Sequence, residues 1–260
     1  RAALESVKRL NWAPDIIHVH DWHTALIPVY LKSLYRGDPF FTKTHSVLTI
    51  HNQAYQGRFS ENEFRMTGLS REVFHPEGVE FHTGINFLKG GINFADRITT
   101  VSPRYAREIQ EPELGEMLDG VLKNRAQVLS GILNGIDPEL WNPEKDPLIP
   151  YRFSRDNLSG KARCKAELQK LCGLPVRPEV PILGMITRLA EQKGINLVRE
   201  ILPWLLHQDI QLVMLGQGDL SHQEYLARTS LEHLEQLYYS SAFNNPLAHL
   251  IEAGADFFLM

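Results

Sequence analysis

The sequence lacks the features that mark membrane and disulfide-rich proteins. It has no apolar run that approaches the roughly 20 residues needed to span a bilayer. Its only cysteines, Cys164 and Cys172, lie in one predicted helix, about 12 Å apart along the axis. That separation is too great for a disulfide, and the spacing does not resemble a metal motif. Such sparse cysteines suit a reducing compartment, so we expect no membrane contact and a cytoplasmic location.

The sequence also lacks an excess of basic residues, internal repeats and low-complexity segments. Its 27 Lys and Arg residues are outnumbered by 31 Asp and Glu residues, which gives a net charge of −4. A nucleic-acid partner is not expected, because phosphate binding favours a basic patch. One short basic cluster, Lys161, Arg163 and Lys165, is interpreted as the solvated face of a helix. The hydrophobic content of 43% is ordinary for a globular protein.

Short apolar runs alternate with longer segments of helical period. This pattern predicts an α/β fold with parallel sheets covered on both faces. A proline-rich stretch, 138–150, divides two such units, and the domain boundary is placed between 1–133 and 134–260. Helices are expected at 22–35, 85–94, from Ser102 onward, and at 157–172, 195–205, 221–239 and 246–253. Strands are expected at 16–20 (a buried strand), 46–51, 97–101, 128–133, 182–187, 210–215 and 256–260.

Ligands of open α/β sheets bind at the carboxyl ends of the strands, so the residues after each strand are candidates. The first strand ends in His18, His20, Asp21 and His23. Three histidines and an aspartate could bind a metal, but the aspartate directly follows the second histidine, unlike the pattern of zinc hydrolases. The alternatives are buried structural histidines, or a polar ligand site in which Asp21 meets sugar hydroxyls.

The second strand ends in His51, Asn52 and Gln53. A histidine at this position can donate a hydrogen bond to a ligand without acting as a base. The amides of Asn52 and Gln53 suit hydroxyl groups. A structural histidine explains the same residues, and the pattern alone does not separate the two interpretations.

In the second half, two strands end in residues suited to an anion. Arg188 and Lys193 follow strand 182–187 and precede a helix, a geometry that can hold a diphosphate. Exposed cations without a ligand are the alternative. Gly216 and Gly218 follow strand 210–215 and permit close approach of the backbone to a ligand, although a tight turn explains them equally well.

Taken in order, these segments resemble the bacterial glycogen/starch synthase family. The similarity covers essentially the whole chain, and the ordered set of motifs is highly specific. It opens with Pro-Asp-Ile-Ile-His-Val-His-Asp-Trp-His at 14–23 and Thr-Ile-His-Asn-Gln-Ala-Tyr-Gln-Gly at 49–57. It continues through 86–91, 100–103, 105–109, 133–137, 141–143, 188–194, 216–219 and 248–260.

The resemblance implies a GT-B fold with two Rossmann-like, doubly wound domains, both incomplete here. Residues 1–133 would be the later part of the acceptor-side domain. Residues 134–260 would be the crossover and the first part of the nucleotide-sugar domain. The implied activity is transfer of glucose from ADP-glucose to the non-reducing end of an α-1,4-glucan, with retention and without metal or other cofactor. UDP-glucose users are a related alternative, and no oligomeric state is implied.

The resemblance also assigns roles to individual residues. Arg188 and Lys193 would hold the diphosphate, and His51 would contact the donor glucose. Asp21 would lie in the same cleft, near acceptor and sugar. The implied substrate-binding residues are Asn52, Asn134, Gly216, Gly218 and Phe243, the last beside the adenine.

Two family motifs have no counterpart in this chain. The lysine–glycine–glycine loop should lie upstream of it and a glutamate-bearing turn downstream, so we expect the 260-residue chain alone to be inactive. Segment 234–241 also lacks the valine-rich strand usual in the family. A non-catalytic glucan- or nucleotide-binding remnant is the main alternative. A metal-dependent hydrolase built on the histidine cluster is a further one.

Overall fold

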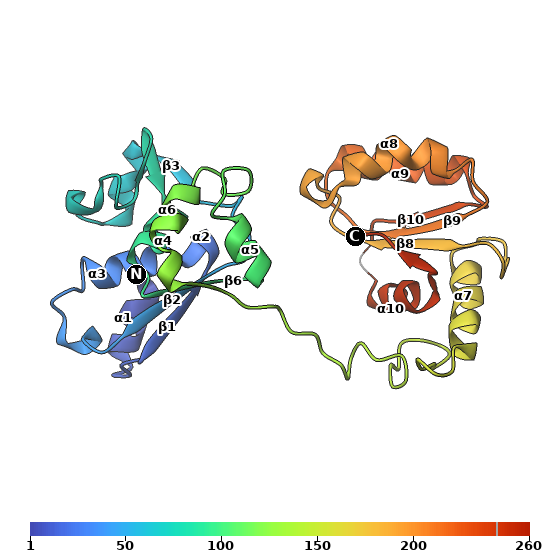
Figure 1. The fold of residues 1–260 in the computed structure, drawn as a ribbon, viewed down its shortest axis with the longest axis horizontal. Helices are drawn as coiled ribbons and strands as arrows, with labels where there is room; N and C mark the ends of the chain where they lie inside the picture. The colour runs from blue at the N-terminus through green and yellow to red at the C-terminus, as the bar shows by residue number, and fades with distance from the viewer. Residues whose placement is uncertain (243) are drawn as a thin grey trace. The chain divides into compact units, whose positions relative to one another are not determined.

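The computed structural model describes residues 1–242 and 244–260. It consists of two compact units, Arg1–Gly135 and Ile136–Met260, hereafter the first and second units (Figure 1). The sequence-based boundary was placed after residue 133. No helix in the described part of the chain is both long enough and apolar enough to cross a membrane.

The first unit is built on a four-stranded parallel sheet. Its strands are β1 (Ile16–His20), β2 (His45–Ile50), β6 (Arg97–Thr100) and β7 (Leu129–Gly131), in the order β1-β2-β6-β7. All four were predicted, to within a few residues. The prediction that 16–20 is a buried strand was wrong, because β1 lies at an end of the sheet. Only Val19 of this strand is buried, and Ile16 is 60% exposed.

The helices of the first unit follow the strands, with sequence signals at several of their ends. They are α1 (Ala2–Arg9), α2 (Asp21–Thr24), α3 (Leu26–Lys32), α4 (Phe87–Phe94), α5 (Pro103–Glu108) and α6 (Asp119–Asn124). The predicted cap at Ser102 is confirmed, since its side chain accepts from the backbone N–H of Tyr105. The predicted helix 22–35 is instead two short helices that meet at Ala25, where Pro28 has no N–H to donate to the carbonyl of Thr24.

Helix α4 contains two adjacent glycines that close packing explains. A β-carbon at Gly91 would lie 2.7 Å from the Cβ of Ala25, and one at Gly90 would lie 2.8 Å from Val79. The glycines therefore let α4 pack tightly against the joint between α2 and α3. The residues before α4 form a small antiparallel sheet that was not predicted, in the order β3 (Arg58–Ser60), β5 (Gly84–Asn86), β4 (Glu80–Phe81).

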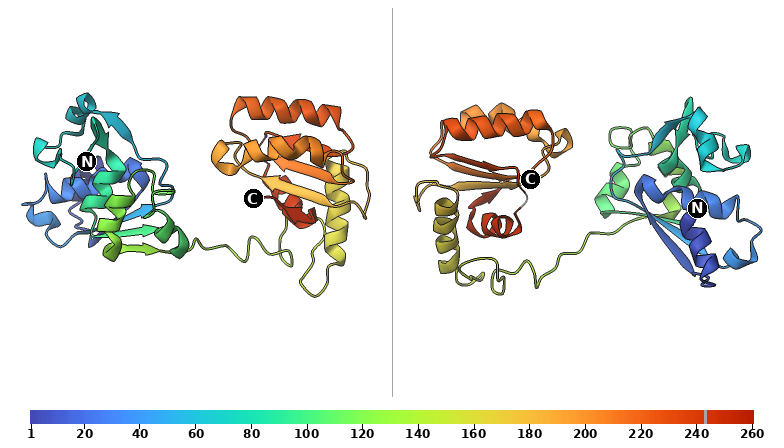
Figure 2. Two further views of the ribbon diagram at one scale, coloured as in Figure 1. Left: turned by 45° about the horizontal axis from the view of Figure 1, so that its top comes forward. Right: turned by 180° about the vertical axis from the view of Figure 1, so that it is seen from behind.

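The second unit has its own parallel sheet, with helices on both faces. The strand order is β10 (Leu237–Ser240), β9 (Gln211–Leu215), β8 (Ile182–Ile186), β11 (Phe257–Phe258). Helices α8 (Ile195–Leu205) and α9 (Leu220–Glu232) cover one face, and α7 (Ser159–Leu171) and α10 (Asn245–Gly254) cover the other (Figures 1 and 2). Central strand β9 is fully buried. Leu212 and Met214 pack into one core and Val213 and Leu215 into the other.

One element of the second unit was wrongly predicted. Segment 221–239 was expected to be a single polar helix, but α9 ends at Glu232 and β10 pairs with β9 in parallel. Regularly spaced leucines extended the helical pattern beyond the true end. The sequence of β10 is not valine-rich, as is usual in the family, but Tyr238 and Tyr239 also favour strands. Leu237 is 2% exposed, so β10 is anchored in the core.

The basic cluster on α7 was interpreted as a solvated face, which is wrong for Lys161 and Lys165, whereas Arg163 is exposed. Lys165 is buried and forms an ion pair with Asp256 at 2.8 Å, while Lys161 donates to the carbonyls of Ala253 and Ala255. These bonds fasten α7 to the segment between α10 and β11. Both cysteines are buried and free, as the spacing predicted.

Candidate active site

The carboxyl ends of β1 and β2 bring the histidines of the first unit together. The two strands pair in register, with His20 opposite Thr49. His18 and His20 project from the same face, with ring centroids 4.3 Å apart. His51 follows β2, and its Nε2 lies 3.1 Å from Nδ1 of His20. Three imidazoles therefore form one connected group at this edge of the sheet.

Asp21 connects the end of β1 to the end of β2. Its Oδ1 accepts a hydrogen bond from the backbone N–H of His51 at 2.7 Å. Asp21 has a φ of 51°, a left-handed conformation uncommon for a residue with a side chain. Such backbone strain is often found at functional sites. The structure thus brings together Asp21 and His51, two of the residues predicted to be catalytic.

Hydrogen bonds connect the histidines to the interior of the sheet. His18 Nε2 lies 2.6 Å from the hydroxyl of Thr49, which in turn lies 2.6 Å from the hydroxyl of Thr99. Burial, followed by the charges of the neighbouring His20 and His51 rings, lowers the pKa of His18. The neutral form of the His18 imidazole is therefore favoured.

The arrangement does not support the metal hypothesis for the histidine cluster. In residues 1–242 and 244–260, no three His, Cys, Asp or Glu side chains are placed to hold a metal ion. His23 does not join the other histidines but stacks on Trp22, with ring centroids 4.0 Å apart. One ring nitrogen of His18 instead faces Thr49, and one nitrogen each of His20 and His51 face one another.

The amide residues after His51 shape the loop that follows. The Asn52 side chain accepts from the backbone N–H of Ala54 at 3.0 Å. Gln53 is buried, and its backbone N–H donates to the hydroxyl of Tyr105. The bond to Ala54 gives the Asn52 amide a role within the loop, and a sugar contact by Asn52 stays a prediction. Asn134 lies exposed after β7, still within the first unit.

In the second unit, glycines let two strand-end loops lie side by side. A β-carbon at Gly216 would overlap the carbonyl oxygen of Thr187, and one at Gly218 would overlap that of Leu189. Leu189 also pairs with Gly218 in a parallel bridge that extends the β8–β9 register. The glycines thus serve an approach of backbone to backbone, and their contact with a ligand stays a prediction.

A cavity lies at this edge of the second sheet. Arg188 and Gly216, two predicted site residues, line it, and Arg188 is exposed. Lys193 is exposed in the short 3₁₀ turn Glu191–Lys193. Neither cation forms an ion pair with any described carboxylate, so both charges remain available to an anion. The described residues that line it are Ile186, Thr187, Arg188, Leu215, Gly216, Gln217 and Ser241.

Three polar residues of this cavity were not predicted: Thr187, Gln217 and Ser241. Thr187 directly follows β8 and precedes Arg188. Gln217 lies between Gly216 and Gly218, after the end of β9. Ser241 directly follows β10, so the strand-end rule would have identified it had β10 been recognised. Phe243, predicted to lie beside an adenine, is outside the described residues.

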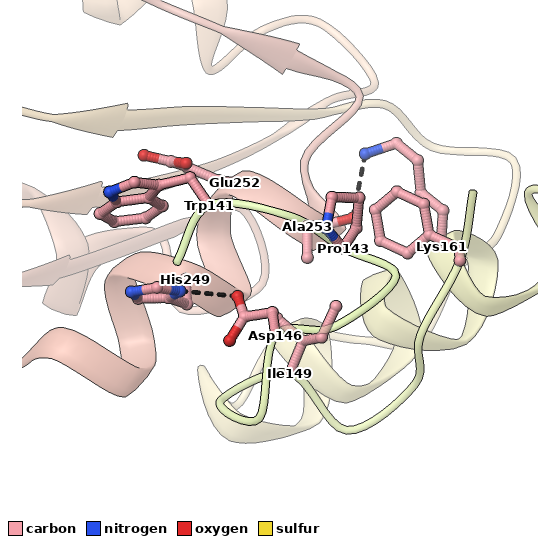
Figure 3. Close-up of a pocket in the computed structure, with 9 residues that line it drawn as sticks. Trp141, Pro143, Asp146, Ile149, Lys161, His249, Glu252 and Ala253 are labelled. Atoms are coloured by element: carbon pink, nitrogen blue, oxygen red, sulfur yellow. Dashed lines mark hydrogen bonds and ion pairs between the residues drawn. The ribbon is translucent and has the colours of Figure 1, made fainter. Parts of the chain in front are cut away.

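A second cavity lies between the proline-rich stretch and α10 (Figure 3). Asp146 and His249 form a buried pair, with Oδ2 2.7 Å from Nδ1 and side chains 6% and 0% exposed. The Trp141 ring stacks on His249, 4.0 Å between centroids and 10° from parallel. Burial raises the pKa of the nearby Glu252 carboxyl. The segment from Trp141 onward is therefore fastened to the second unit rather than free.

The chain is similar in sequence to known glycogen and starch synthases. A family model described as the starch synthase catalytic domain matches residues 1–124. Glycogen synthase from Anaeromyxobacter dehalogenans strain 2CP-1 is 50% identical over 260 residues, which cover 100% of this chain and 54% of that protein. Glycogen synthase from Pseudothermotoga lettingae is 47% identical over 259 residues, covering 100% and 53%. The chain thus spans about half the length of these curated relatives.

A solved structure shows the same similarity in three dimensions. The catalytic domain of starch synthase IV from Arabidopsis thaliana, bound to ADP and acarbose, aligns with a TM-score of 0.90 and 34% sequence identity. The alignment covers 99% of this chain and 54% of that one. The similarity therefore extends over both units and both strand-end sites.

Proposed function

This chain belongs to the glycogen and starch synthase family, and on that premise we propose that the protein containing it transfers glucose from ADP-glucose to an α-1,4-glucan. The acceptor is the non-reducing end of the glucan, and the configuration at the transferred carbon is retained. The fold is of the family's GT-B type, with parallel α/β sheets in each unit. The proposal concerns the whole protein.

The observation that carries the proposal is the unpaired charge of Arg188 beside the strand-end cavity of the second unit. Glycosyl transfer leaves a nucleoside diphosphate whose negative charge grows as the sugar departs. Fixed cations that meet this charge lower the barrier, because they need no reorganisation during the reaction. An arginine offers a two-pronged contact to phosphate and a lysine a point charge. We assign these roles to Arg188 and Lys193.

The remaining roles follow from the same assignment. Gly216 and Gly218 would admit the nucleotide near the sheet edge, and Phe243 would lie beside the base. In the first unit, His51 and Asp21 would meet the donor sugar and the acceptor, with Asn52 and Asn134 as additional polar contacts. Since the two cations supply the charge that a metal would otherwise supply, the proposed reaction uses no metal or other cofactor.

An adenine nucleotide is the proposed donor base. The support is the similar plant starch synthase, whose structure holds ADP and acarbose. UDP-glucose is the competing donor, and direct comparison of the two separates them. The buried, unpaired cysteines support a reducing compartment, for which we propose the cytoplasm.

The test is glucose transfer onto glycogen from labelled ADP-glucose and UDP-glucose, with the full-length protein and its Arg188→Ala variant. Loss of one preorganised donor typically costs about 10²–10³ in rate, and we expect a loss of that size. Arg228→Ala, which removes an exposed arginine on α9, is the matched control and should retain full activity. Unchanged transfer by Arg188→Ala would contradict the assignment.

A further inference from the structure

The ring of His51 has a hydrogen-bonding partner that no assigned role explains. Nδ1 of His20 lies 3.1 Å from Nε2 of His51, within hydrogen-bonding distance. A bond between two neutral imidazoles requires one N–H donor and one bare nitrogen acceptor. If both facing nitrogens carried a proton, two N–H groups would oppose each other, and if neither did, the pair would have no donor. The contact therefore couples the tautomers of the two rings, because only one of the two facing nitrogens carries a proton.

His20 is itself held in place from two directions. Its backbone N–H and carbonyl both bond to the hydroxyl of Thr24 at 2.7 Å, at the start of α2. Its ring packs against His18, whose Nε2 is bonded to Thr49 on β2. The His20 ring thus has a position set by the sheet rather than by His51. The main chain of His51 is set independently, by the bond from its N–H to Asp21.

The direction of the bond follows from the chemistry of imidazole. Free neutral histidine prefers the tautomer with its proton on Nε2. If His51 donates from Nε2 and His20 accepts at Nδ1, both rings keep this preferred form. Nδ1 of His51 is then a bare acceptor on the side of the ring away from His20. A sugar hydroxyl, which can donate one hydrogen bond, suits that acceptor.

We propose that His20 is a positioning residue: it holds the proton of His51 on Nε2, so that Nδ1 accepts a hydroxyl of the donor sugar. The inference rests on the proposed function, which places His51 against that sugar. In this proposal His20 acts through His51 rather than through a contact of its own with the substrate. It explains why two histidines of the first strand end lie next to a histidine of the second.

The first test is kinetic and uses two variants of nearly equal shape, His20→Leu and His20→Asn, in the full-length protein. Asparagine retains a hydrogen-bond acceptor and leucine does not. A lost hydrogen bond of ordinary strength corresponds to roughly a 3- to 10-fold loss, which we expect in kcat for His20→Leu. The KM for glycogen should not change, and His20→Asn should recover most of the rate. His45→Leu, at the exposed amino end of β2, is the control.

The second test observes the bond directly and does not depend on activity. In full-length protein with ¹⁵N-labelled histidine, NMR should show a coupling across the hydrogen bond between His51 Nε2 and His20 Nδ1. The proton should be bonded to His51. A proton on His20 instead, or no coupling, would overturn the inference even if the enzyme is active. Absent glucosyl transfer in the unmutated protein would contradict the proposed function while leaving this result meaningful. Equal rates in the leucine and asparagine variants would also overturn the inference.

Discussion

The most specific prediction concerns the substitution Gly216→Ala, because the structure indicates both the sign and the size of the change in the free energy of unfolding. A β-carbon there would fall on the carbonyl oxygen of Thr187, inside the 3.0 Å that real β-carbons keep. That atom belongs to the backbone, so no side-chain rotation relieves the overlap, and the two strand-end loops must separate. Such overpacking costs about 1–3 kcal/mol. The hydrogen bonds from Thr187 to Leu215 and from Gly216 to Ser240 would weaken, each by up to about 1 kcal/mol.

We therefore expect Gly216→Ala to lower the free energy of unfolding by about 2–4 kcal/mol. Urea denaturation followed by circular dichroism measures it, as a lower midpoint at an unchanged slope. The matched control is Gly120→Ala in helix α6, where an added β-carbon meets nothing within 4 Å. There the better helix propensity of alanine should raise stability by about 0.5–1 kcal/mol. Equal midpoints for the two variants would refute the argument that Gly216 is fixed by backbone contact.

Two further predictions follow from titrating groups. Burial raises the pKa of the Cys172 thiol to about 12 and also raises that of Cys164, so neither should react with iodoacetamide at about pH 8 until urea unfolds the chain. Rapid labelling of the native protein would contradict this. The lowered pKa of His18 means that the unfolded state binds more protons below about pH 6.5, so stability should fall as pH drops through that value. A urea midpoint that falls from about pH 7.5 to pH 5.5 in the parent and less in His18→Asn checks it; an equal fall in both assigns the effect to other groups.

The sequence predicted those parts of the fold in which local pattern and burial agree. Strand β2 alternates buried and less buried residues, and Ser102-Pro103 marks the start of α5 with its own side chain and ring. Strand β10 was missed because the leucine spacing of α9 continues through 237 and outweighed the local strand preference of Tyr238 and Tyr239. The interpretation of the basic cluster on α7 as a solvated face was wrong for Lys165 for a related reason. Its partner, Asp256, lies far along the chain.

The candidate site residues were likewise identified where they follow a recognisable strand, and their contacts were not. The strand-end rule identified Asp21, His51 and Arg188, because each follows a recognisable strand. It could not show the bond from the His51 N–H to Asp21 or the contact between His51 and His20, which depend on the register of β1 against β2. For Gly216 the sequence left ligand approach and tight turn equally open. The neighbouring backbone of Thr187 shows that the turn alone is sufficient reason for the glycine.

Each of the two sites is built by a backbone contact between neighbouring strand ends. In the first unit, Asp21 accepts from the main chain of the residue after β2, and in the second, the loop after β9 lies against the loop after β8. Contacts of this kind place a side chain with the precision of the sheet, because the strand register cannot shift without moving a whole face. Arg188 has no partner of this kind, but its position depends on the contact between the loop after β8 and the loop after β9. The proposed binding of ADP should therefore be weaker in Gly216→Ala even under conditions in which the second unit remains folded.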